Sequence, residues 1–148
     1  MSEKEKMKDE VRVRSRVTAQ LIDRRTGEVV QEETVSNLIT DVGENMLCYW
    51  TKGDITTKGY VTHMSLSDET ADPAETETTE SGTNIGPRKT TTGTILASKI
   101  TFTTTWLENE ANYTIRRAYL FSAETGGNLY ATSKFATPFT KTSDYTFK

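Results

Sequence analysis

The sequence predicts a mostly β protein: a single antiparallel β-sandwich or barrel of about seven strands, with one short helix and one long polar loop. Three observations predict this fold class. Threonine is the commonest of the 148 residues, and its β-branched side chain disfavours helix interiors but suits the solvated face of a strand. Hydrophobic residues make up 34% of the chain, in short runs that alternate with polar residues. The mean hydropathy of -0.60 fits antiparallel sheets with one face in water.

The first element follows a charged segment. Residues 1–10 carry both charge signs and no apolar periodicity, so we expect a flexible N-terminal arm ahead of a single β domain over residues 11–148. The segment VRVRSRVTAQLI then alternates strictly between apolar and polar residues, which predicts a strand. Gly27 can close a turn that leads into a second strand at Glu28–Val30.

A change of period predicts the only helix. Apolar residues recur at steps of three and four over about residues 38–50, the pattern of an amphipathic helix. Asn37 is the expected N-cap and Gly53 the expected end. Gly43, inside the helix, costs about 1 kcal/mol relative to alanine.

A long polar segment follows the next predicted strand, which covers residues 60–66. Residues 68–92 contain several acidic residues, proline and glycine, and almost nothing apolar. A loop of this length inside a compact domain is usually functional or disordered. We expect its carboxylates to be solvated and Ile85 to be its apolar anchor.

The last third of the sequence predicts strands throughout. We expect Leu96, Ile100, Phe102 and Trp106 to share one face of the sheet. Two further strands flank the turn at residues 123–127. Pro138 is expected to break the second of them, and residues 145–147 to form a final short strand.

The inventory of reactive residues excludes most enzyme classes. His63 is the only histidine and Cys48 the only cysteine, and we interpret both as structural, with Cys48 buried in the helix as a small hydrophobic residue. Two such ligands cannot complete a zinc site, and no glycine-rich phosphate loop precedes the helix. We therefore expect a protein that is not an enzyme, with no metal, no cofactor and no small-molecule substrate.

Charge gives the strongest candidate binding feature. The net charge is -3, which argues against nucleic acid, and no apolar run approaches the length of a membrane span. Arg12, Arg14 and Arg16 would line one strand face about 6–7 Å apart. This stripe has two interpretations: a charged edge that prevents aggregation, or a docking surface for acidic protein groups. Ile85 and Arg88 complete the candidate partner-binding set.

Several phrases resemble a family of small virion proteins of tailed bacteriophages. These phrases are NLITDVG at the helix start, ITFTTTWLENEAN, RRAYLFSAETGGNLYA and KFATPFTKTSDYTF. They cover most of the chain from about residue 35 onward. The motifs consist of turn and core residues, so they specify a fold better than a task.

The resemblance implies a non-enzymatic virion structural protein. The chain ends after its last strand without a repetitive shaft, which favours a capsid decoration (cement) protein that binds the major capsid protein. The alternatives are a tail, neck or baseplate adaptor, a fibre-base protein, or a carbohydrate- or receptor-binding β-module. The last would use exposed aromatics such as Trp50, Tyr60, Trp106 or Tyr113 for stacking, but Trp50 and Trp106 fall on apolar faces, so we expect both in the core. The resemblance further implies synthesis in the host cytoplasm and location in the virion. Together with the low apolar content it predicts a homotrimer, or a monomer that trimerises on its lattice, with an interface that we expect near Phe135 and Phe139.

Overall fold

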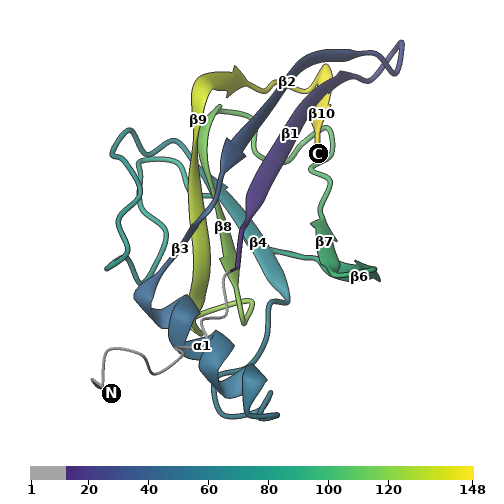
Figure 1. Cartoon of the computed structure of the whole chain (residues 1–148). Helices are drawn as coiled ribbons and strands as arrows, with labels where there is room; N and C mark the ends of the chain where they lie inside the picture. The colour runs from purple at the N-terminus through teal and green to yellow at the C-terminus, as the bar shows by residue number, and fades with distance from the viewer. Residues whose placement is uncertain (1–12) are drawn as a thin grey trace, which may run out of the picture.

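The structure is a computed structural model that describes residues 13–148. The expected arm at residues 1–10 and Arg12 lie outside the described residues. Within residues 13–148 the fold is mostly β, with antiparallel strand pairing and one helix, as predicted (Figure 1). The strands form two packed sheets and a separate hairpin.

The outer sheet has the order β10-β1-β2 and the central sheet the order β3-β9-β8-β4-β5. The strands β6 and β7 form a two-stranded sheet of their own, here called the pendant hairpin. The strands run over β1 Arg16–Asp23, β2 Val29–Ser36, β3 Leu38–Ile39, β4 His63–Ser67, β5 Lys89–Thr90, β6 Thr92–Leu96, β7 Lys99–Thr103, β8 Thr114–Phe121, β9 Leu129–Thr140 and β10 Tyr145–Phe147.

The main core lies between the outer and central sheets. Alternation along β1 places Ala19 and Leu21 on the buried side and Arg16 on the exposed side, as the sequence predicts. These residues pack against aromatic side chains of β9 and β10. Phe135 and Phe139 belong to this core, where both pack edge-on against Phe147. Both side chains are buried within the single chain, and the trimer interface expected near them stays a prediction.

The helix α1 spans Asp41–Thr51 and packs at one end of β9. Its N-cap is Thr40, three residues after the expected Asn37, because Leu38 and Ile39 pair with β9 as the short strand β3. The Thr40 hydroxyl accepts a hydrogen bond from the Gly43 backbone N–H (2.9 Å) and donates one to the Leu129 carbonyl (2.6 Å). The cap therefore joins the helix to the central sheet.

Pro138 does not break the last long strand. β9 continues through it to Thr140. The register of the β8–β9 pair moves from Arg117↔Lys134 to Ile115↔Phe139, so several β9 residues bulge opposite one residue of β8. A proline is tolerated inside such a bulge because the ladder needs no N–H from it.

Candidate functional site

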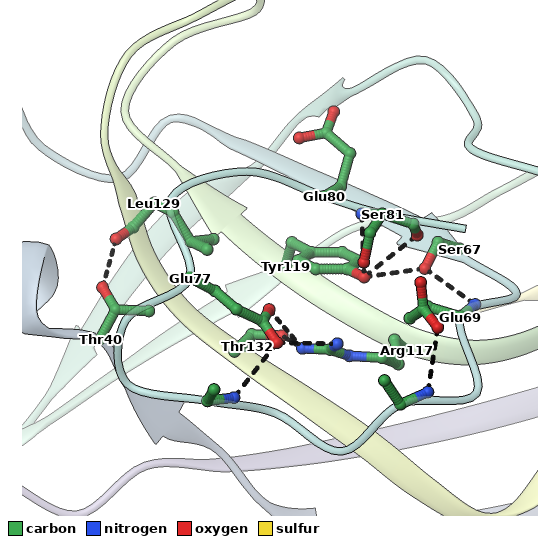
Figure 2. Close-up of polar contacts among 12 residues, drawn as sticks. Thr40, Ser67, Glu69, Glu77, Glu80, Ser81, Arg117, Tyr119, Leu129 and Thr132 are labelled. Carbon is green, nitrogen blue, oxygen red and sulfur yellow. Dashed lines mark hydrogen bonds and ion pairs between the residues drawn. The ribbon is translucent and has the colours of Figure 1, made fainter.

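The segment between β4 and β5, residues 68–88, is here called the covering loop. It lies over the face of the central sheet that the outer sheet leaves open (Figure 2). That face carries Arg117, Tyr119 and Phe121 at alternate positions of β8, together with Thr132 of β9. All four side chains are buried. The expectation of a fully solvated polar loop is wrong, because the loop forms a layer of the fold.

Arg117 is the centre of this layer. It is 0% exposed, and its two terminal nitrogens donate to the two oxygens of Glu77 in the covering loop, at 3.0 and 2.7 Å. The second of these nitrogens also donates to the Thr132 hydroxyl at 2.5 Å. The Nε atom is buried without a hydrogen-bond partner among the described residues. A buried guanidinium of this kind needs its carboxylate, since an unpaired buried charge costs several kcal/mol.

Tyr119 holds the next part of the covering loop. Its hydroxyl lies 2.9 Å from the Ser67 hydroxyl and accepts a long hydrogen bond from the Ser81 backbone N–H (3.5 Å). The Arg117 guanidinium lies 5.0 Å from the centre of the Tyr119 ring, within the range of cation–π attraction. The ring stacks on Phe121 with centroids 6.3 Å apart.

Arg88 closes the far end of the covering loop. Its Nε and one terminal nitrogen bind the two oxygens of Glu80 at 3.2 and 2.9 Å. The other terminal nitrogen donates to the carbonyls of Ala123 and Gly126 in the β8–β9 turn, at 3.0 and 2.6 Å. The guanidinium also lies 3.4 Å from the centre of the Phe121 ring. Arg88 thus has an internal role, which does not fit its assignment to a partner-binding surface.

The pKa of Glu80 reports the balance of forces in this pair. Burial is the largest single influence and raises the pKa of the carboxyl, but the hydrogen bonds from Arg88, the Glu80 backbone and Thr79, together with the positive charge of Arg88, outweigh it, so the net pKa is lowered from its usual value. Glu80 is therefore ionised in the folded protein at neutral pH.

The acidic residues at the start of the covering loop are also engaged. Asp68 and Glu69 line a surface hollow of about 560 Å³. The Asp68 carboxylate accepts from the backbone N–H groups of Thr83 (2.8 Å) and Asn84 (2.9 Å) and from the Asn84 side chain (2.8 Å). Burial raises the pKa of Asp68, but these hydrogen bonds lower it by more. These oxygens organise the loop. No group of three or more histidine, cysteine, aspartate or glutamate residues suited to a metal ion occurs within residues 13–148.

The structure describes four of the five predicted partner-binding residues, all but Arg12, and these four do not share one environment. Arg14 and Arg16 are exposed at the start of β1, while Arg88 is enclosed by the covering loop. Ile85 forms a β-bridge with Ser67 through its backbone, and its side chain remains exposed. Its backbone rather than its side chain therefore anchors the loop.

The reactive and aromatic residues occupy mixed environments. Cys48 is exposed on α1, so its expected burial is wrong: it lies on the solvent side of the helix. His63 begins β4, and its Nδ1 lies 2.8 Å from the Thr62 hydroxyl. Trp106 is part of the main core, as expected. Trp50 packs on Tyr130 and donates from its ring nitrogen to the Gly59 carbonyl at 2.7 Å.

The pendant hairpin differs from the expected arrangement. Ile95 pairs with Ile100 and Gly93 with Phe102, so these four positions share a face. Leu96 pairs with Lys99 on the opposite face, because the chain reverses at Ala97, which has a φ of 54°. The expected common face of Leu96 with Ile100 is therefore wrong. Placing a turn between Leu96 and Lys99 would have revealed this from the sequence.

Sequence and structure comparisons did not identify relatives: no protein-family model, curated protein or solved structure matches the chain. Within residues 13–148, no helix combines the length and the apolar character needed to cross a membrane.

Proposed function

We propose that the protein is a non-enzymatic structural component of a tailed-phage virion, and specifically a capsid decoration protein that binds capsid subunits. The proposal rests on the sequence resemblance described above, and one structural observation supports it. Arg14 and Arg16 lie exposed and two residues apart at the start of β1. Arg12 continues this stripe in the sequence.

The contrast with the internal arginines explains why this stripe suits docking. Arg88 and Arg117 are each bound to a glutamate of the same chain, and they stabilise the covering loop. Arg14 and Arg16 instead present guanidinium groups at the surface, where they can form two-point hydrogen bonds with carboxylates of a partner.

A carbohydrate-binding role has less support. Stacking on sugars needs exposed aromatic faces. Trp106 is buried in the main core, Tyr113 packs against that core and Trp50 packs against Tyr130. Of the four candidate aromatics this leaves Tyr60, which is 56% exposed. A tail, neck or baseplate adaptor uses the same chemistry as a decoration protein and differs in copy number. Quantitative mass spectrometry of purified particles distinguishes the two: many copies per particle indicate decoration, and a few indicate an adaptor.

Attachment to heads that lack the protein tests the docking surface. We expect the variant Arg14→Ser/Arg16→Ser to attach more weakly than wild type at low salt. The difference should shrink as salt rises, because exposed charge pairs are screened within about 10 Å at 0.1 M. The matched control is Arg25→Ser/Lys52→Ser, which removes two exposed cations elsewhere. Wild-type occupancy of the Arg14/Arg16 variant at low salt would refute docking through this stripe.

A further inference from the structure

The pendant hairpin carries the most exposed apolar side chains of the described chain. Leu96 is 79% and Ile95 75% exposed, the two highest values among the large hydrophobic residues described, and Ile100 is 53% exposed. Leu96 lies on the opposite face of the hairpin from the two isoleucines. The two residues are direct cross-strand partners, so their side chains stand side by side on one face. Gly93 extends this face: a Cβ at that position would lie 2.9 Å from both Ile100 Cδ1 and a carbon of the Phe102 ring. The hairpin therefore presents an apolar strip of Ile95, Ile100 and Phe102.

The two faces of the hairpin differ in character. Thr94 and Thr101 pair on the side opposite Ile95 and Ile100, next to the Leu96–Lys99 pair. This second side is mainly hydroxyl-bearing, as expected for a strand face in water. Figure 1 shows the hairpin set apart from the two packed sheets. A two-stranded ribbon of this kind is marginally stable alone in water and gains stability when its apolar face is covered.

The apolar strip continues the interior of the domain. Phe102 is partly buried against the core cluster formed by Met46, Val61, Leu120 and neighbouring residues. Ile100 and Ile95 extend from Phe102 toward the hairpin tip, where they are exposed. The strip thus resembles part of a domain core left uncovered. This is the character of interfaces between identical, permanently associated subunits, which are more hydrophobic than those of transient complexes.

The scarcity of charged residues on the hairpin also favours an identical subunit as the partner. The hairpin segment 92–103 contains one charged residue, Lys99, whereas the whole chain has 18 lysine and arginine residues, 21 aspartate and glutamate residues, and a net charge of -3. Two copies of an acidic chain repel one another least where charge is absent. A charged capsid surface would instead be recognised by charged residues, as proposed for Arg14 and Arg16.

From these observations we propose that the apolar strip of Ile95, Ile100 and Phe102 is a contact surface for a second copy of this chain. The two copies cover each other's isoleucines and complete the core that each leaves open. This self-association surface lies on different residues from the proposed capsid-docking stripe, so the two proposals stand or fall separately.

Sedimentation velocity of the purified full-length chain, over a wide range of protein concentration, tests the proposal. We expect wild type to associate reversibly or to remain oligomeric throughout. The variant Ile95→Thr/Ile100→Thr should raise the dissociation constant by about tenfold or more, because two aliphatic side chains lose their burial. Threonine keeps the β propensity of the hairpin, and both sites are exposed, so the variant should fold.

The matched control is Leu96→Thr, which removes a side chain that is 79% exposed on the opposite face of the same hairpin. It should associate like wild type. Hydrogen exchange provides a second measurement on wild type alone: the amides of residues 92–103 should become more protected as protein concentration rises. A wild-type chain that stays monomeric at every concentration would overturn the proposal. So would a double variant that associates like wild type, or a Leu96→Thr effect equal to that of the double variant, which would indicate a contact without a preferred face.

Discussion

Glu77 of the covering loop and Arg117 of the central sheet form a two-point ion pair with N–O distances of 3.0 and 2.7 Å. Forty residues separate them in the chain. Their contact fixes a predominantly polar loop over a sheet face that carries a buried arginine. The covering loop therefore depends on the Glu77–Arg117 pair for its position, and the buried charge of Arg117 depends on Glu77 for its counter-charge.

Removing the carboxylate of this pair should destabilise the protein strongly. In Glu77→Ala the Arg117 guanidinium stays buried without a counter-charge, so we expect a loss of about 3 kcal/mol in the free energy of unfolding. Urea denaturation at neutral pH measures this loss. Glu75→Ala is the control, since Glu75 is an exposed glutamate of the same loop and contacts α1 through its backbone carbonyl. Equal stability of the two variants would show that Arg117 does not depend on Glu77.

The Glu80–Arg88 pair should make stability depend on pH. The folded pKa of Glu80 lies below its usual value of 4.5, so the pair stabilises the fold above the unfolded pKa. This contribution is lost as pH falls through the folded pKa. We expect the free energy of unfolding to be steady between neutral pH and about pH 5 and to fall below about pH 4.5. Denaturant titrations at a series of pH values measure it.

The variant Glu80→Gln separates this pair from the other carboxylates. It should be less stable than wild type at neutral pH and should lose less stability on acidification, because glutamine does not titrate. The control Glu124→Gln removes an exposed carboxylate from the β8–β9 turn and should follow the wild-type profile. A Glu80→Gln profile parallel to that of wild type would contradict the assignment.

Gly43 should be intolerant of alanine although it lies inside a helix. Helix propensity alone favours alanine by about 1 kcal/mol. However, a Cβ at this position would lie 2.0 Å from the Tyr130 carbonyl oxygen, so the helix must move away from β9. We expect Gly43→Ala to lower the free energy of unfolding by about 2 kcal/mol, as measured by thermal or urea unfolding. Asn45→Ala, at an exposed position of the same helix, should be neutral or slightly stabilising. A stabilised Gly43→Ala would show that the helix can shift at little cost.

Local patterns in the sequence were sufficient to predict the mostly β fold. The alternation that precedes Asp23 predicted β1 and the sides its residues face, because side chains on a strand point to opposite faces at every step. The three- and four-residue spacing predicted α1 to within a few residues at its start. The turn composition at residues 123–127 predicted the β8–β9 hairpin. Each of these patterns involves interactions between residues close in the chain.

The candidate sites depended on contacts that no local pattern contains. Glu77 and Glu80 look like solvated acids in the sequence, and only the packing of the covering loop brings them to Arg117 and Arg88. The internal role of Arg88 was missed for the same reason.

The sequence by itself determined the class of fold, the strand faces and the helix, since these follow from backbone geometry and side-chain periodicity. The tertiary structure decided which charges are buried in pairs, why Gly43 must lack a side chain, and which apolar residues remain uncovered at Ile95 and Ile100. Burial is a property of segments that meet in space, and its energetic effect on a charge or a methyl group depends on the neighbour it meets.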